Sequence, residues 1–153
     1  MENNRKSEAV RIFLNGYNCC QAVVLAYEDL IVQMNPGMTR EALARLGNMF
    51  GSGVAGTGEV CGAFNGLCMV LGLVSDIPTD DRMARMPIYR DIQGMSDAFA
   101  EKFKSVRCRD ILKNFGPDPY FDDDEELAEI YAKRPCAKCV AYAVDMIEEY
   151  LNK

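Results

Sequence analysis

Seven cysteines and no histidine stand in this chain of 153 residues. Disulfides are rare in reducing compartments, and an odd number of cysteines does not suit a fully paired disulfide framework. Thiols in this number therefore indicate metal or redox chemistry. Because imidazole is missing both as a ligand and as a general base, any site for a soft metal must be built from thiolates, helped by carboxylates or backbone groups.

Four of the cysteines stand where a helix is predicted to begin. These four are Cys19, Cys61, Cys108 and Cys136. Free N–H groups and the helix dipole at such positions favour a thiolate or an anionic cluster. Hydrophobic burial alone gives no reason for cysteines to prefer helix starts over helix interiors. We therefore expect the four side chains to converge on one site.

Two further cysteines are predicted to lie outside that site. Cys20 follows Cys19 directly, and neighbouring side chains diverge by about 100° on a helix. Cys68 follows Cys61 by two helical turns, a rise of about 10.5 Å, which is too far for one ion. Cys68 is therefore expected in the core, and Cys20 is a substitute ligand should Cys19 not serve.

The remaining cysteine belongs to the motif Cys136-Ala137-Lys138-Cys139, which follows Pro135. Cysteines three residues apart share a helix face, and Lys138 and Arg134 add positive charge. The pair could form a redox dithiol, half of a metal site, or two thiols packed in the core. A thioredoxin-like site would need a strand and a βαβ unit, which this sequence lacks. Cys139 is the second substitute ligand.

A glycine-dense segment, residues 51–58, precedes Cys61 and spells G-x-G-x-x-G at 51–56. The dinucleotide fingerprint requires a strand before it, whereas a helical pattern precedes it here, so no nucleotide is expected. The segment is expected to connect two closely packed helices or to form a lid over Cys61. The acidic run 122–126 lacks the spacing of a calcium loop and suits a helix start. Tyr17 could lie in the core or in the wall of a site, and the core is favoured.

Apolar residues recur at helical spacing through nearly the whole chain. We expect an all-α bundle of about six or seven helices in a single domain, 1–153. The expected helices are one that ends at Gly16, 19–32, 39–50, 59–74, 80–104 with a possible break near Pro87 or Gly94, 122–134 and 135–151. Residues 108–115 add a short helical segment. The helix 59–74 should be central, because Gly62, Gly66 and Gly72 inside it suggest close packing against a neighbour.

The bulk composition limits the partners. A net charge of −6 disfavours nucleic acid and anionic membranes. No apolar run reaches the 18 to 20 residues, roughly, that a membrane span needs, and no secretory signal is recognised. A cytosolic location with reduced thiols, an unidentified redox partner and a homodimer as an open option are the expectations.

The motifs resemble those of one known family. Residues 18–23 read NCCQAV and residues 61–66 read CGAFNG, and Cys108 and Cys136 follow them in order. This arrangement resembles the C_GCAxxG_C_C family of redox-active proteins. The resemblance implies that the family cysteines are Cys19, Cys61, Cys108 and Cys136. Part of the family resembles a domain of split-Soret cytochromes, which implies an iron–sulfur cluster. Covalent haem is not expected, because no Cys-x-x-Cys-His is present.

Three functions remain open at this stage. The first is a redox protein with a thiolate-bound cluster or metal, for which iron–sulfur is favoured over zinc because clusters are ordinarily held by cysteines alone, whereas structural zinc sites draw on closely spaced pairs. The second is a thiol–disulfide redox protein in which Cys61 or Cys136 attacks. The third is a non-catalytic helical interaction module with cysteines in its core.

Overall fold

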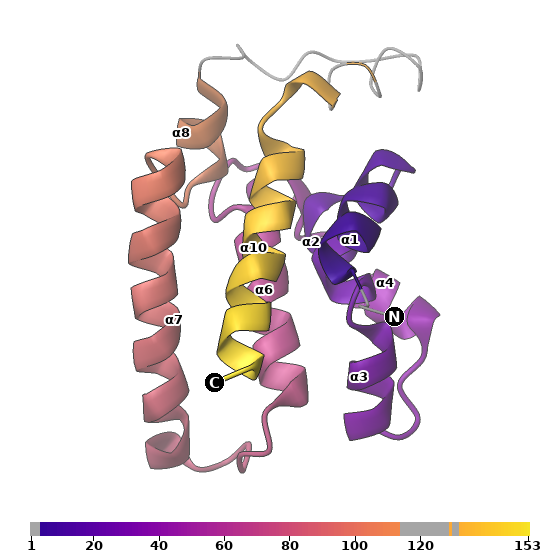
Figure 1. Ribbon diagram of the computed structural model, residues 1–153, viewed down its shortest axis with the longest axis vertical. Helices are drawn as coiled ribbons and strands as arrows, with labels where there is room; N and C mark the ends of the chain where they lie inside the picture. Colours follow the sequence, from indigo (N-terminus) through magenta and orange to yellow (C-terminus); the bar gives the residue numbers. More distant parts are fainter. Residues whose placement is uncertain (1–3, 114–128, 130–131) are drawn as a thin grey trace.

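The computed structural model describes residues 4–113, 129 and 132–153, and within this part the chain is built from helices (Figure 1). The helices are α1 (Arg5–Leu14), α2 (Cys19–Leu25), α3 (Glu28–Met34), α4 (Arg40–Gly47), α5 (Gly51–Val54), α6 (Gly62–Val74), α7 (Arg82–Phe103), α8 (Cys108–Leu112) and α10 (Cys136–Leu151). The all-α prediction is confirmed. In the described residues, the β-structure is limited to an isolated bridge between Val60 and Arg107. The helix expected at 122–134 lies outside the described residues, apart from 129 and 132–134.

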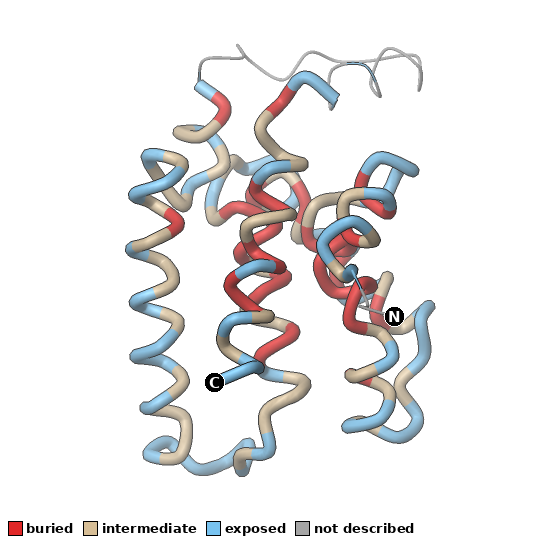
Figure 2. Tube along the Cα trace, in the orientation of Figure 1, coloured by how far each residue is buried: buried red, intermediate tan, exposed pale blue. Residues whose placement is uncertain are grey.

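Helix α6 lies at the centre of the fold, as the sequence predicted, although it begins at Gly62 and not at residue 59. It packs mainly against α2 and α10, and also against α3. Figure 2 shows the buried residues concentrated in α2, α6 and α10. The fully buried side chains of α6 include Leu67, Val70 and Leu71. This apolar centre fixes the positions of the helix ends around it.

Two glycines allow α6 to approach α2 closely. A Cβ atom on Gly66 would lie 2.9 Å from both the Cys20 carbonyl oxygen and the Val23 Cβ. A Cβ atom on Gly62 would overlap the sulfur of Cys19. Close helix packing therefore explains both residues, as expected. It does not explain Gly72, because nothing lies within 4 Å of the corresponding position there.

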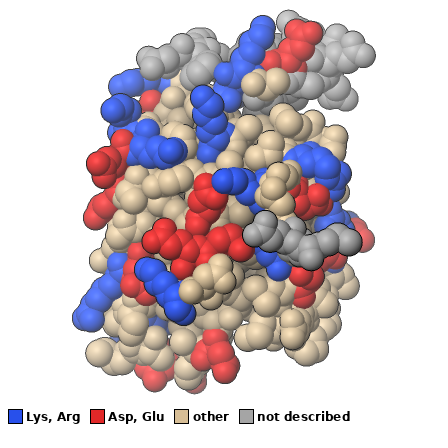
Figure 3. Space-filling model, viewed as in Figure 1, with Lys and Arg blue, Asp and Glu red and all other residues tan. Residues whose placement is uncertain are grey.

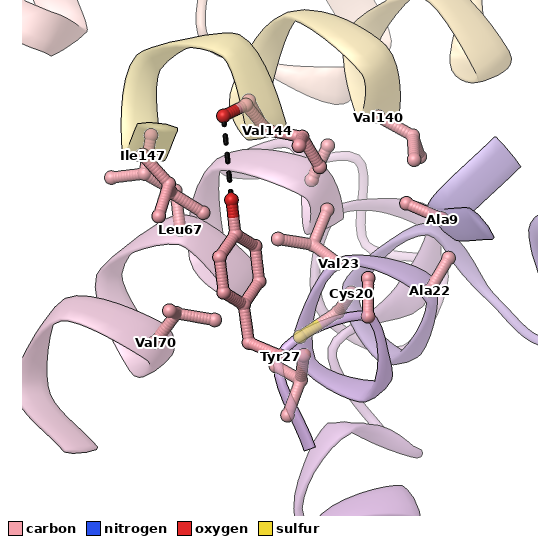
Figure 4. Packing of buried hydrophobic residues seen from close by; sticks show 14 of the residues in the cluster. Ala9, Cys20, Ala22, Val23, Tyr27, Leu67, Val70, Val140, Val144 and Ile147 are labelled. Atoms are coloured by element: carbon pink, nitrogen blue, oxygen red, sulfur yellow. Dashed lines mark hydrogen bonds between the residues drawn. The ribbon is translucent and has the colours of Figure 1, made fainter. Parts of the chain in front are cut away.

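The single helix expected at 19–32 is wrong, because the chain turns between α2 and α3 at Ala26 and Tyr27. The turn places the fully buried ring of Tyr27 between α6 and α10 (Figure 4). Its hydroxyl donates to the Glu148 carboxylate at 2.7 Å and lies 3.5 Å from the Val144 carbonyl oxygen. The Arg5 guanidinium covers the ring at 4.8 Å from its centroid. The buried tyrosine thus fastens α1 and α10 to the α2–α3 junction.

The predicted starts of the helices 19–32 and 39–50 are confirmed by side-chain caps at Asn18 and Thr39. The Asn18 side chain accepts a hydrogen bond from the Gln21 N–H at 2.8 Å, and the Gln21 side chain accepts one from the Asn18 N–H at 3.0 Å. This reciprocal pair is a capping box. The Thr39 hydroxyl accepts from the Ala42 N–H at 3.1 Å. Local sequence therefore determines where α2 and α4 begin.

Helix α7 is a long surface helix, as predicted, but it runs without the expected break through Pro87 and Gly94. Phe99 is its one fully buried residue, and its ring centroid lies 5.5 Å from that of Phe64 and 4.8 Å from that of Phe103. This aromatic cluster attaches the C-terminal half of α7 to the core. None of the described helices is both long enough and apolar enough to cross a membrane.

Gly66 is closely packed and Gly72 has free space around it, so alanine at these two positions should change the free energy of unfolding in opposite directions. Gly66→Ala should lower the free energy of unfolding by about 1–3 kcal/mol, because the added methyl group meets a backbone carbonyl that cannot move easily. Gly72→Ala should raise it by up to about 1 kcal/mol, because alanine is the better helix former and has room. Urea unfolding of the reduced chain measures both. A shift of the same sign in both variants would contradict the packing described for α2 and α6.

Candidate functional site

One cavity of about 610 Å³ gathers most of the cysteines. It lies where α1 ends and where α2, α6, α8 and α10 begin. Its lining includes Cys19, Cys61, Cys108, Cys136 and Cys139. The structure therefore brings together the four cysteines that were expected to share a site, together with the substitute Cys139.

The two other cysteines do not line this cavity. Cys20, the other proposed substitute, is fully buried in the core, and its sulfur lies 3.6 Å from the sulfur of Met69. Cys68 is partly buried and packs against the core from α6. Because the side chains of Cys19 and Cys20 point in different directions on one helix, Cys19 lines the cavity and Cys20 lies in the core, as the helical geometry predicted.

All four expected cysteines stand at helix starts. Cys19, Cys108 and Cys136 are the first residues of α2, α8 and α10, and Cys61 is the N-cap residue of α6. The first N–H groups of a helix have no partner within the helix, so they can donate to a sulfur anion. The helix-start prediction is confirmed for each of these residues.

A short antiparallel pairing holds the starts of α6 and α8 side by side. The Cys61 N–H donates to the Val106 carbonyl at 2.7 Å, and the Cys108 N–H donates to the Glu59 carbonyl at 2.7 Å. The Arg107 guanidinium also reaches the Glu59 carboxylate, at 3.1 Å. These bonds fix two cysteines that are distant in sequence at the edge of the same cavity.

The glycine-dense segment forms a left-handed turn in the cavity wall. Ser52, Gly53, Val54 and Ala55 have φ values of 53°, 66°, 67° and 51°. The Ser52 N–H donates to the Cys19 sulfur. A Cβ atom on Gly53 would lie 2.7 Å from the Cβ of Cys108. The segment therefore does more than connect helices, because it contacts two of the cavity cysteines.

Cys61 is the thiol that the structure holds most readily as a thiolate. A hydrogen bond from the Cys139 thiol is the largest cause of its lowered pKa, and the N–H groups of Ala63 and Phe64 lower that pKa further against the opposing effect of burial. The same hydrogen bond and burial raise the pKa of Cys139 well above its ordinary range. Cys61 and Cys139 thus form a donor–acceptor pair with opposite ionisation preferences.

Two further cavity thiols, Cys136 and Cys19, have pKa values above the ordinary range of a thiol. Burial raises the pKa of Cys136 to about 12, and the charges of Cys61 and Cys108 add to this effect while Arg134 opposes it. Burial also raises the pKa of Cys19, as do the nearby charges of Cys61 and Cys136. Ionising several of these thiols together therefore needs a cation that compensates their mutual repulsion.

The cavity thiols surround a space and do not converge on a point. Among the described residues, no group of three His, Cys, Asp or Glu side chains is placed to hold a single metal ion. All seven cysteines are free thiols.

Two residues that line the cavity, Tyr17 and Arg134, were not predicted from the sequence to do so. Tyr17, expected in the core, is 38% exposed and lines the cavity, because it follows Gly16 in the connection between α1 and α2, where no helix face buries it. Arg134 is only 6% exposed and also lines the cavity. The sequence showed its charge beside Cys136 but could not show its burial.

The described lining of the cavity contains the cation Arg134, although the chain is acidic overall. No Asp or Glu occurs among its described lining residues. On the face shown in Figure 3, basic and acidic side chains are interspersed, and a group of acidic ones lies across the middle. The site is therefore suited to anionic groups.

The ionisation pattern predicts selective alkylation of Cys61. In the reduced, metal-free chain at pH 7, iodoacetamide should modify Cys61 before Cys68, whose pKa burial raises to about 11. The Cys61 rate should fall about tenfold for each pH unit below its lowered pKa, because only the thiolate reacts. Cys139→Ala removes a hydrogen-bond donor and should move this profile to higher pH. Peptide mass spectrometry follows both sites, and faster labelling of Cys68 at pH 7 would contradict the assignment.

Comparisons with known proteins identify a family for the chain. The family model described as "Putative redox-active protein (C_GCAxxG_C_C)" matches residues 17–150. An uncharacterised protein of Archaeoglobus fulgidus is 24% identical over 149 residues, which cover 92% of this chain and 89% of that protein. No solved structure matches the chain. Because the family model covers most of the chain and includes all five cavity cysteines, the chain belongs to the C_GCAxxG_C_C family of redox-active proteins.

Proposed function

We propose that the cavity cysteines form a thiolate site for an iron–sulfur cluster, and that the protein exchanges electrons with a redox partner in the cytosol. The observation that carries the proposal is the meeting of four thiols, from four separate helix starts, around one cavity. A bound cluster would supply one-electron transfer at a potential tuned by its surroundings. Cys19, Cys61, Cys108 and Cys136 would hold it.

The donor chemistry of the cavity fits such a cluster. Iron–sulfur clusters are ordinarily held by four cysteine thiolates, and the chain has no histidine that could replace one. A thiolate-bound cluster is anionic, so the starts of α6 and α10 and the buried Arg134 favour it. Free N–H groups at helix starts, and a nearby cation, stabilise an anion of this kind.

The protonation states also fit a site that is completed by metal. Cys61 offers a thiolate first, because its pKa is lowered. Cys19 and Cys136 keep their protons until cationic iron offsets the repulsion between the sulfur charges. Binding should therefore release protons, as it does at other thiolate sites.

A single ion such as zinc fits less well. Tetrahedral zinc needs its ligands gathered within bonding distance of one point, and the described residues show no group of three that meets this condition. A polynuclear cluster connects thiolates that lie farther apart, because each iron binds its own cysteine. The spread of the cavity thiols therefore favours the cluster.

Anaerobic reconstitution of the full chain with ferrous iron and sulfide tests the proposal. The wild type should bind iron and sulfide in a fixed ratio and acquire visible absorption. Serine at Cys19, Cys61 or Cys108 should remove most of the bound iron, whereas Cys68→Ser, outside the cavity, should leave it unchanged. Failure of the wild type to bind iron and sulfide, or equal losses in Cys68→Ser, would overturn the proposal.

The same reconstitution decides between the two cysteines at the start of α10. Cys136→Ser and Cys139→Ser are a matched pair, because both residues line the cavity from one helix. If Cys136 is the ligand, Cys136→Ser should lose the visible absorption and Cys139→Ser should retain it. The reverse result would assign the ligand to Cys139.

A second candidate, thiol–disulfide exchange, is favoured by the hydrogen bond between Cys139 and Cys61. The Cys61 thiolate would attack one sulfur of an external disulfide, forming a mixed disulfide and releasing one thiolate. Cys139, on losing its proton, would then attack the Cys61 sulfur and release the second thiolate. The protein dithiol is oxidised to a disulfide, and the external disulfide is reduced to two thiols.

Oxidised glutathione tests this candidate on the reduced, metal-free chain. Peptide mapping should find a disulfide between Cys61 and Cys139. Cys139→Ser should stop at the mixed disulfide of glutathione with Cys61, because the resolving thiol is gone. Cys68→Ser should behave as the wild type does. A disulfide formed between other cysteines, or none, would contradict the candidate.

A further inference from the structure

Helix α7 lies at one edge of the molecule, where the core supports only part of its length. It has 22 residues, which corresponds to about 33 Å at 1.5 Å per residue. Figure 1 shows α10 beside it on one side, and Figure 2 shows that most of its length is exposed or intermediate. No apolar residue of its first half, 82–91, packs against the core cluster of the described residues. Its contacts with that cluster come from Ile92, Met95, Ala98, Phe99 and Phe103.

A second face of α7 points to solvent along the whole helix. Positions that alternate by three and four residues lie on one side of a helix and form the seam between paired helices. In α7 this spacing connects six residues, all of them exposed, which we call the outer face. They are Met83, Pro87, Arg90, Gly94, Asp97 and Glu101. Met83 is 75% exposed, which is high for an apolar side chain.

Gly94, in the middle of the outer face, has no explanation within one chain. A Cβ atom at this position would have no neighbour within 4 Å, and the residue does not have a positive φ. Glycine is unfavourable in a helix interior relative to alanine, but it allows another backbone to approach closely. Gly94 also lines a groove of about 390 Å³ between α7 and α10. A helix that crossed α7 at Gly94 would cover this groove.

Opposite charges lie on the two sides of Gly94. Arg90 precedes it by four residues and Asp97 follows it by three, and within the described part of the chain neither side chain forms an ion pair or a side-chain hydrogen bond. Seven residues correspond to about 10.5 Å along the helix axis, so the two charges cannot pair with each other in one chain. Gly72 is equally open, but α6 contains no charged residue.

This arrangement is complementary to itself. If two copies of α7 pack antiparallel about a two-fold axis beside Gly94, Arg90 of each copy lies level with Asp97 of the other. The same axis generates both ion pairs, as it does in an isologous dimer. A parallel pair of helices would instead bring like charges together. A second copy of the chain therefore fits the outer face better than a partner of a single charge sign.

We infer that the outer face of α7 binds the outer face of a second copy of this chain, with the helices antiparallel and crossing at Gly94. Two identical ion pairs between Arg90 and Asp97 set the register, and Met83 of each copy covers the last turn of the partner's helix. Because this face contains few apolar side chains, the dimer is weak and sensitive to salt. The inference is independent of the cluster proposal, since α7 contains no cysteine.

Sedimentation equilibrium of the full chain, reduced and metal-free, tests the inference over a range of protein concentrations. The wild type should associate to a species of twice the mass of one chain. Its dissociation constant should increase with the concentration of sodium chloride, because the ion pairs are exposed. A wild type that stays monomeric up to about 1 mM, or that forms a dimer insensitive to salt, would overturn the inference.

Charge reversal tests the register. Arg90→Glu and Asp97→Arg should each weaken self-association at least tenfold, because each dimer would then contain two pairs of like charges. An equimolar mixture of the two variants should associate about as tightly as the wild type, because both contacts of a mixed dimer again join opposite charges. Unchanged association of either single variant, or no recovery in the mixture, would contradict this interface.

Glutamine at two open glycines tests the close approach of the helices. Gly94→Gln should weaken association at least tenfold, because a polar side chain would hold the two backbones apart. Gly72→Gln is the matched control, because Gly72 is also an exposed helical glycine with free space around it. It should leave the dissociation constant unchanged. Urea unfolding should show that neither variant destabilises the monomer. Equal dissociation constants for Gly94→Gln and the wild type would overturn the inference.

Discussion

The close contact of α6 with α2 is the constraint on which the rest of the structure depends. Gly66 faces the Cys20 carbonyl and Gly62 faces the Cys19 sulfur, so neither position has room for a side chain. The same contact builds the core and sets the position of Cys19 relative to Cys61 at the start of α6. Gly62, directly after Cys61, therefore has two effects. It allows α6 to pack closely against α2, and it leaves room for the Cys19 sulfur beside the start of α6.

The electrostatics of the cavity follow from that packing. Burial raises the cost of a thiolate at Cys19, Cys61, Cys136 and Cys139, and of these four thiols Cys61 alone has a lowered pKa, through two N–H groups and the Cys139 thiol. Cys19 and Cys136 remain protonated for the same reason. A fold that gathers thiols in this way has one thiol whose pKa is lowered, Cys61, and others, Cys19 and Cys136, that ionise only beside a positively charged ligand. The two redox proposals therefore share one physical basis.

Local sequence predicted the helix starts but could not predict how they meet. The reciprocal pair Asn18 and Gln21 and the proline before Cys136 are local signals, and both mark helices that the structure contains. The break at Tyr27 depends on a hydrogen bond to Glu148, which lies 121 residues away, so no periodicity could reveal it. The exposure of Tyr17 and the burial of Arg134 likewise depend on neighbours brought together only by the fold. The predicted convergence of cysteines rested on a resemblance and on helix electrostatics, and the individual ligands stay predictions.

The left-handed turn at residues 52–55 has a conformational free-energy cost, which contacts elsewhere in the fold compensate. Ser52, Val54 and Ala55 adopt a conformation that costs a residue with a side chain about 1–2 kcal/mol. The contacts that this conformation makes possible lie in the cavity wall, where the Ser52 N–H donates to the Cys19 sulfur and Gly53 packs against Cys108. The compensation lies elsewhere, in the apolar contacts of α2, α6 and α10. The strained turn contacts Cys19 and Cys108, and packing alone gives no reason to keep such strain, so the turn favours a functional role for this wall of the cavity.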